Sequence, residues 1–558
     1  MRVVNTTEYA ELEESGDYHL LFGRTWGAPY DPHSYMSSWK EPSHFEHKAT
    51  LGMTEPLTQD RMLTLIEEAQ RETDTNVLAA KWREVHAGVH AQALFFPLWG
   101  TRNPSVINRR LFGFQPSSQA YSYPLETVQI AAGSDIVTAA PAFGDTLFTS
   151  TGPIHPHHYS PNNMNAQAWV YEGLVGYGQD GEITPVLATS WKKDTTSSGG
   201  ERYTFTLREN VVFHDGSAWN CSVAKLNFDH ILEGAVKTRH DWMPSIDVME
   251  SWNCNAAGQF EIVTKEPYSP LLQELSYIRP FTFASAASFA NGLDTDPVTQ
   301  NGCMGFQGRH EAIEESITCA GLSAPIGTGV FKFMNRTKKT AINGDEVDGE
   351  VVFARNDDHW GPQTGIRLLK VVHYETTQEV ESALLSDELD MALGLGSLTA
   401  KQVFKFKSEH SDRFDVRHTD VLQHALLVFN SNRVPTNDIR VRQAIIHAID
   451  KNKFIEDEFS SLEQPVGQLL PYNAPYCNVY LNPKWSYDLD KALLLNCPDP
   501  ASISNSSSDG LSSGAIGGIV VAAVVASGMV AFVVFLVSKE RSGQPVFAPE
   551  KVKHAEEA

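Results

Sequence analysis

Hydrophobic and polar residues recur with two different periods along the chain, which predicts a mixture of helices and strands. Helices are predicted at residues 58–70, 75–93 and 439–449, where apolar side chains repeat at the i, i+3, i+4, i+7 spacing of one helix face. The three stripes are Met62, Leu65, Ile66 and Ala69; Leu78, Trp82, Val85 and Val89; and Val441, Ile445, Ala448 and Ile449. Shorter helices are expected at residues 222–232 and 270–275.

Short apolar or alternating runs between these helices predict strands. The runs lie at residues 18–22, 94–99, 182–189, 203–207, 211–214, 260–264 and 425–430. Pro97, inside the second run, favours a place at the edge of a sheet because proline has no amide hydrogen to donate. The alternation of strands and helices predicts a layered α/β or α+β body.

One segment predicts a membrane helix. Residues 515–537 carry no charge, and a helix of that length spans roughly 34 Å, enough to cross the hydrocarbon core of a bilayer. Lys539 and Arg541 follow at once, so the positive-inside rule places residues 538–558 in the cytosol and the upstream part outside. We therefore expect a single-pass protein of the cell membrane.

Residues 498–514 are rich in Ser and Gly and are expected to form a flexible stalk before that helix. Gly514 and Gly518 have the spacing that lets two membrane helices pack closely, which would give a weak dimer. No signal peptide follows Met1, because residues 2–20 are mostly polar. Either an upstream signal is missing from the chain, or the internal apolar segment directs insertion.

Composition narrows the class of protein. The formal net charge of −24 argues against nucleic-acid binding, which usually needs a basic face. Six cysteines permit three disulfides, with six unlinked thiols as the alternative in a reducing compartment. Neighbours along the sequence suggest the pairs Cys221–Cys254, Cys303–Cys319 and Cys477–Cys497. Sequons at Asn5, Asn220, Asn335 and Asn505 hint at a glycoprotein on a secretory route.

Common catalytic motifs are absent from the sequence. There is no Walker A or HExxH motif, and the cysteines do not have the spacing of zinc ligands. One GxSxG match occurs at residues 510–514. A nucleophile elbow needs a strand before it and a helix behind it, and this match lies in the Ser/Gly-rich stalk, so a chance match is the favoured interpretation. No nucleophile–base pair or carboxylate dyad stands out, so neither an enzyme nor a cofactor is expected.

Five stretches resemble family 5 of the solute-binding proteins, which serves ABC importers of nickel, dipeptides and oligopeptides. They are NAQAWVYEGLVGY at 165–177, PVLATSW at 185–191, YTFTLRENVVFHDG at 203–216, APIGTGVF at 324–331 and VRQAIIHAIDKNKFI at 441–455. Residues 152–167 and the RPF run at 279–281 are similar to the nickel-binding branch. The resemblance implies a bilobal, type II periplasmic-binding-protein-like α/β fold that closes on its ligand by hinge motion. Here it would carry a single C-terminal transmembrane helix.

The order of the resembling segments is unusual. Residues 1–127 resemble the C-terminal part of the family, and the stretch at 23–44 (GRTWGAPYDPHSYMSSWKEPSH) is typical of its nickel branch. Residues 128–497 resemble the head, so the chain runs from tail to head. Either the tail belongs to an upstream tandem module, with the chain truncated, or tail and head dock as one permuted module.

The resemblance also implies ligand-binding residues for a metal held as a complex with a small chelator. His44 matches the histidine that contacts the metal, and imidazole suits nickel. Arg239 and Arg279 match arginines that grip the chelator's carboxylates through paired hydrogen bonds. The matching cleft walls are Trp26, Tyr30, Tyr159, Met164 and Trp242.

Two further features accompany this set. Tyr121 falls where the family has a threonine, so the ligand is not expected to be identical. The histidines at positions 155, 157 and 158 could capture metal, but a solvated loop is the favoured interpretation.

We therefore expect a membrane-anchored extracellular binding protein for a nickel-like metal chelate or a small peptide-like ligand. Its partner would be an ABC-type membrane permease. The alternatives are a cell-surface receptor or adhesion module that kept the fold without transport, and a truncated module of a larger tandem protein.

Overall fold

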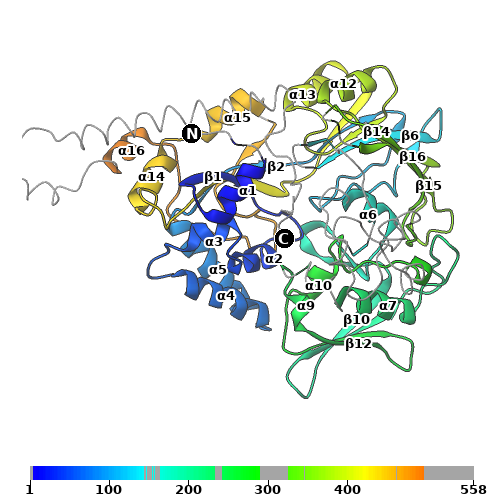
Figure 1. Ribbon diagram of the computed structural model, residues 1–558, viewed down its shortest axis with the longest axis horizontal. Helices are drawn as coiled ribbons and strands as arrows, with labels where there is room; N and C mark the ends of the chain where they lie inside the picture. The colour runs from blue at the N-terminus through cyan, green and yellow to red at the C-terminus, as the bar shows by residue number, and fades with distance from the viewer. Residues whose placement is uncertain are drawn as a thin grey trace, which may run out of the picture.

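The computed structural model describes residues 4, 6–143, 146–147, 154, 156–157, 164–232, 240, 242–288, 325–342, 344, 346–459 and 462–495. This part of the chain forms two lobes built on three main sheets (Figure 1). Short elements outside them are α1 (Thr6–Ser15), β4 (Leu111–Phe112), β5 (Gln129–Ile130), β8 (Val175–Tyr177), η3 (Gln179–Gly181) and β9 (Ile183–Pro185).

The first lobe contains a four-stranded antiparallel sheet with helices on both faces. In spatial order its strands are β1 (Leu20–Arg24), β19 (Gln423–Phe429), β2 (Phe95–Thr101) and β20 (Gln464–Pro465). Its helices are α2 (His33–Ser37), η1 (Ser38–Lys40), α3 (Phe45–Thr50), α4 (Gln59–Arg71), α5 (Thr75–Ala91), α14 (Ile439–His447), α15 (Lys451–Phe459) and α16 (Leu489–Leu495).

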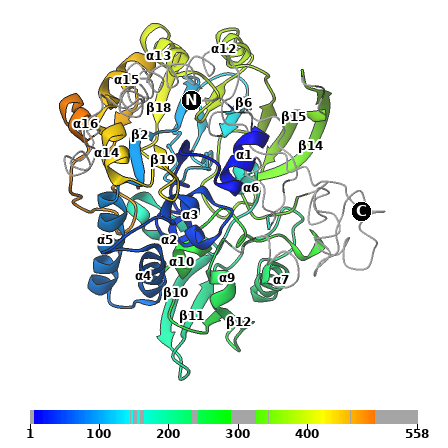
Figure 2. The same ribbon diagram turned by 60° about the vertical axis from the view of Figure 1, so that its left-hand side comes forward.

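This sheet joins the two segments whose relationship the sequence left open. β1 and β2 belong to the first 127 residues, and they pair with opposite edges of β19 from the later segment. Figure 2 shows β2 and β19 side by side. The tail and the head are therefore docked on each other in one folded unit.

The run 94–99 forms a strand, but the predicted edge position is wrong. β2 lies between β19 and β20, and Pro97 pairs with Leu426 next to a register shift, after which Trp99 pairs with Ala425. An irregularity in pairing accommodates a residue that cannot donate to the ladder. Every residue of the strand is buried because it is covered on both faces, with Phe95 and Phe96 in different core clusters.

The second lobe contains an eight-stranded mixed sheet. It runs β14 (Phe331–Thr340), β15 (Glu346–Arg355), β16 (Leu368–Val372), β6 (Ile136–Phe143), β17 (Met391–Leu393), β3 (Pro104–Asn108) and β18 (Phe414–His418), with β7 (Thr146–Leu147) paired to β6. Strand β6 is parallel to β16 and β17, and the other pairs are antiparallel. Helices α6 (Met164–Val170), α12 (Thr377–Leu385) and α13 (Ala400–Glu409) accompany this sheet.

A third sheet forms a subdomain beside it. Its order is β10 (Ala188–Thr195), β11 (Glu201–Leu207), β13 (Phe260–Thr264) and β12 (Met249–Cys254), with helices α7 (Cys221–Leu232), α9 (Ser245–Val248) and α10 (Leu271–Leu275) nearby. Residues 211–214 were predicted as a strand but make only the isolated bridge of Val212 with Ala218.

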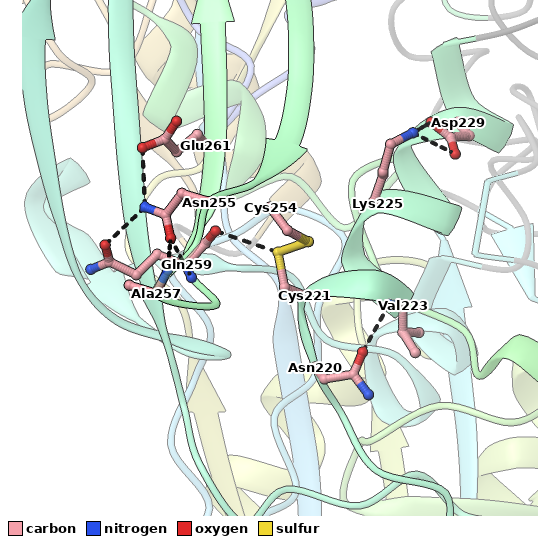
Figure 3. The surroundings of a disulfide bond; sticks show 10 residues. All are labelled: Asn220, Cys221, Val223, Lys225, Asp229, Cys254, Asn255, Ala257, Gln259 and Glu261. Carbon is pink, nitrogen blue, oxygen red and sulfur yellow. Dashed lines mark hydrogen bonds and ion pairs between the residues drawn. A yellow bond between two sulfur atoms is a disulfide. The ribbon is translucent and has the colours of Figure 1, made fainter.

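A disulfide joins Cys221 at the start of α7 to Cys254 at the end of β12, with 5.8 Å between the Cα atoms (Figure 3). This confirms the first predicted pair. Cys477 is a buried free thiol, so its predicted bond is not formed, and Cys303, Cys319 and Cys497 lie outside the described residues. The sequon residues Asn220 and Asn335 are exposed, and their glycosylation stays a prediction.

Two chain crossings connect the lobes, from β2 to β3 and from β18 to β19. They are hydrogen-bonded to each other. The amide of Leu422 donates to the carbonyl of Thr101 (3.1 Å), and the amide of Asn103 donates to Oγ1 of Thr419 (2.9 Å). Paired crossings of this kind are where a two-lobed protein bends.

The predicted helix at 439–449 exists as α14, but its predicted inward face is wrong. Arg442 and Ile446 are buried, whereas Val441 and Ile445 are only half-buried. The Arg442 guanidinium donates to the carbonyl oxygens of Gln92 (2.8 Å) and Thr436 (2.6 Å). These carbonyls satisfy its donors, so an arginine can occupy the buried face of α14, next to the aliphatic stripe that was predicted to face inward.

The predicted stalk, membrane segment and cytosolic tail, residues 498–514, 515–537 and 538–558, lie outside the described residues, as do Gly514 and Gly518. Among the helices that the structure describes, none is both long and apolar enough to cross a membrane.

Candidate functional site

Four aromatic side chains meet where the tail contacts the third sheet's subdomain. The ring of Trp26 lies 5.7 Å from that of Trp242, edge to face, and Tyr30 lies 5.8 Å from Trp242 and 4.4 Å from Tyr277. Trp242 and Tyr277 stack with 6.2 Å between their centroids. We call Trp26, Tyr30, Trp242 and Tyr277 the aromatic cluster. It brings together three of the predicted wall residues and adds Tyr277.

Polar contacts beneath the aromatic cluster fasten the two segments. The Ser34 hydroxyl and the Tyr268 hydroxyl each donate to Oε1 of Glu274 at 2.8 Å, and the Ser245 amide donates to Oε2 at 3.0 Å. Burial raises the pKa of Glu274, although these hydrogen bonds oppose the shift. Gln273, the preceding residue of α10, donates to the Asp31 carbonyl at 3.2 Å. α10 therefore holds the tail through hydrogen bonds with Asp31 and Ser34.

Arg279 follows α10 closely and is 4% exposed. The loop that follows Arg279 is fixed by a hydrogen bond from Nε2 of His157 to the Thr282 carbonyl, at 2.9 Å. The planar, two-pronged guanidinium of an arginine is suited to a carboxylate partner. Arg239, its predicted companion, lies outside the described residues.

His44 stands at the N-cap of α3 and is half-buried. Its side chain does not cap the helix, and its ring lies 6.1 Å from that of Trp26. The structure thus places the predicted metal ligand beside the aromatic cluster. Tyr159 lies outside the described residues, as does the side chain of Met164, whose backbone begins α6.

The expectation of a solvated histidine loop is wrong for His157, which is 1% exposed. Its Nδ1 lies 2.6 Å from Nδ1 of His230, and Nε2 of His240 donates to its carbonyl at 2.9 Å. Burial lowers the pKa of His157 to about 4, so the ring is neutral at pH 7. His157 thereby links the loops that lead to Trp242 and Arg279. His155 and His158 lie outside the described residues.

A second buried group lies away from this site, under α5. His86 and Cys477 face each other with 3.8 Å between Nε2 and Sγ, beside a cavity of about 20 Å³ that has room for one water. Burial lowers the pKa of His86 to about 4 and raises that of the Cys477 thiol. Over the described part of the chain, no three His, Cys, Asp or Glu side chains converge to hold a metal ion.

Sequence reasoning missed Tyr277, Glu274, Gln273 and Gln423. Each acts through contacts with residues more than 200 positions away, such as Ser34 with Glu274. Tyr277 and Gln273 lie within the stretch that leads to the matched Arg279, which was the one available signal. A single chain gives no means of foreseeing which buried polar side chain meets which carbonyl.

Comparison with known proteins gives concordant results. The model of the bacterial extracellular solute-binding proteins, family 5 (middle), matches residues 182–495. The chain is 30% identical over 370 residues to the nickel-binding periplasmic protein of Escherichia coli K12, covering 66% of this chain and 61% of that protein. It is 26% identical over 359 residues to the glutathione-binding protein GsiB of Pectobacterium atrosepticum, covering 63% and 59%.

Among solved structures, NikA from Brucella suis in complex with Fe(III)-EDTA is similar, with a TM-score of 0.51 at 27% identity. The match covers 67% of this chain and 65% of that one. The chain spans about three fifths of the length of the curated relatives it matches. These named relatives are binding proteins rather than enzymes.

One expectation is corrected by these findings. The chain was expected to be a single-pass protein of the cell membrane with a cytosolic C-terminus. The E. coli relative is a periplasmic protein, and no described helix can span a bilayer, so this localisation is not supported.

Proposed function

Because the chain belongs to family 5 of the bacterial extracellular solute-binding proteins, we propose that it binds a small metal chelate, of the nickel class, at the aromatic cluster. The observation that carries the proposal is the 5.7 Å contact between Trp26 and Trp242, which come from the two docked segments. A ligand placed against both indoles would touch both lobes and favour their closed arrangement.

Arg279 and His44, two basic side chains near the aromatic cluster, suit a metal complex with a carboxylate-bearing chelator. The buried Arg279 would bind a carboxylate, and the interaction is stronger there than at the surface because little water screens it. His44, whose ring lies 6.1 Å from that of Trp26, would offer its imidazole to the metal. The aromatic faces would pack on the organic part of the complex.

The names of the relatives agree with this ligand class. The E. coli relative is named for nickel, and the B. suis structure holds iron with EDTA, a polycarboxylate chelator. In this chain the complex is cargo, released to a partner, and the proposed partner is an ABC-type permease. Peptides are the second candidate, because other relatives are named for glutathione and for di- and tripeptides.

Calorimetric titration of the purified protein tests the proposal. We expect heat from the nickel–histidine complex, and a large loss of affinity in Trp26→Ala and Arg279→Lys, since lysine cannot reproduce a paired hydrogen bond. Tyr480→Ala, at an 82% exposed position, is the matched control and should bind like the unsubstituted protein.

The outcomes separate the candidates. Heat from glutathione or dipeptides alone would replace the metal chelate by a peptide. Heat from none of these solutes would leave a receptor or adhesion module that kept the fold without this ligand.

A further inference from the structure

The loop that carries Trp26 is fastened to the second crossing between the lobes. Gln423 is the first residue of β19, directly after that crossing. Its Nε2 lies 3.1 Å from the Thr25 carbonyl, 3.1 Å from the Trp26 carbonyl and 3.0 Å from the Tyr121 hydroxyl. The Tyr121 hydroxyl in turn donates to the Trp26 carbonyl at 2.9 Å. Gln423, Tyr121 and Trp26 therefore form a closed ring of hydrogen bonds.

The loop that carries Trp26 also packs closely against the crossing between β18 and β19. Gly27 has φ +85°, and a Cβ there would come within 2.4 Å of Cγ of Gln423 and 2.8 Å of the Leu422 carbonyl. The Ala28 amide donates to that carbonyl at 3.2 Å. Only glycine both adopts this conformation and permits this approach, so the backbone at Gly27 packs directly against Leu422 and Gln423.

Gln423 is also tied to the first crossing. Oγ1 of Thr101 donates to the Gln423 carbonyl at 3.1 Å, and the Leu422 amide donates to the Thr101 carbonyl at 3.1 Å. Gln423 thus contacts both connections between the lobes, and its side chain holds the Trp26 loop. Rotation of the lobes bends these connections.

We propose that Gln423 and Tyr121 are positioning residues that couple lobe rotation to the place of the Trp26 indole in the ligand wall. Tyr121 adds a second link, because its ring lies 5.8 Å from that of Tyr30. The ligand part of this inference rests on the proposed function; the coupling itself does not need a ligand.

The coupling is tested in the ligand-free protein labelled with 5-fluorotryptophan, by ¹⁹F NMR. The Trp26 resonance is assigned by its loss in Trp26→Phe. We expect Gln423→Met and Tyr121→Phe each to shift or broaden it, because each removes hydrogen bonds that fix the loop while keeping the size of the side chain. The resonance of Trp82, a fully buried residue of α5, should keep its position and so report that the variant is folded.

Matched controls are Gln464→Met and Tyr480→Phe, both at exposed positions, and they should leave both resonances unchanged. A Trp26 resonance at its original position and width in both Gln423→Met and Tyr121→Phe would overturn the proposal.

Affinity for nickel–histidine gives the second measurement. Each variant should bind about five- to tenfold more weakly, as expected for the loss of one or two hydrogen bonds. The double variant should lose little more than the worse single one, because the two residues share one network. Fully multiplicative losses would contradict the shared network. If the unsubstituted protein does not bind this complex, the proposed function fails, while the fluorine spectra still decide the coupling.

Discussion

The indole of Trp26 meets that of Trp242 edge to face at 5.7 Å, although the two residues come from segments that the sequence order places far apart. Edge-to-face packing is the arrangement that aromatic rings prefer, and it contributes energy beyond the area buried. The contact is therefore a sensitive measure of whether the tail and the head are truly one module.

A double-mutant cycle on this pair should show coupling. Trp26→Ala, Trp242→Ala and the double variant, compared by urea unfolding, are expected to give an interaction free energy of about 1 kcal/mol. Additive effects would mean that the two rings do not meet in solution.

The hydrogen bond between Ser34 and Glu274 is a polar contact that joins the same two segments, the tail and the head. Ser34→Ala should lower the free energy of unfolding by about 1 kcal/mol, because a buried acceptor loses one donor. Glu274→Gln should cost more, roughly 2 kcal/mol, since its new amide group faces hydroxyl and amide donors. Denaturant unfolding measures both, and Ser382→Ala, an exposed serine of α12, serves as the control. Equal stability of all three variants would argue that Glu274 does not receive the tail.

The buried His157 predicts a dependence of stability on pH. Its folded pKa of about 4 lies below the ordinary value of 6.5, so the unfolded chain takes up a proton first as pH falls. Its contribution is complete above pH 6.5 and is lost as pH falls towards 4, when a proton on Nδ1 would face His230. The loss amounts to roughly 3 kcal/mol at most.

Thermal unfolding between pH 7.5 and 4 measures this effect against His157→Asn, which cannot titrate. The variant should be less stable at pH 7.5 but lose less stability on acidification. Parallel pH profiles for the two proteins would show that His157 is not the neutral, buried group described.

The disulfide predicts a response to reductant. Cys221 and Cys254 are separated by 33 positions, and closing a loop of that size stabilises a protein by about 3–4 kcal/mol on the chain-entropy account. Dithiothreitol should therefore lower the melting temperature of the natural protein. The Cys221→Ala/Cys254→Ala variant should melt lower without reductant and respond little to it. A melting temperature unaffected by reductant would contradict the bond.

Local signals in the sequence predicted local structure well. α4 and α5 begin after Thr58 and Asp74, whose side chains accept hydrogen bonds from backbone amides in the first turn of each helix. The apolar stripes predicted for these two helices are buried in the structure. The buried face of α14 was missed because Arg442 reaches the carbonyl of Gln92, which lies 350 positions away in the sequence. Pro97 was misplaced because its bulge depends on the partner strand.

The residues of the candidate site also fall into two groups, those that the sequence could name and those that only the folded structure shows. The resemblance named Trp26, Tyr30 and Trp242 as wall residues and proposed Arg279 and His44 as ligand contacts. The structure brings the three wall residues together. Glu274 and Gln423 could not be found, because a buried glutamate or glutamine shows its role only through partners brought close by folding. The ligand-binding roles of all eight residues stay predictions: Trp26, Tyr30, His44, Tyr159, Met164, Arg239, Trp242 and Arg279.

The most direct test of the account is a diffraction experiment at the nickel absorption edge, on crystals grown with the nickel–histidine complex. The account predicts a strong anomalous peak at coordination distance from His44, against the aromatic cluster. A peak beside His86 and Cys477 instead, or no peak at the aromatic cluster at saturating complex, would contradict it.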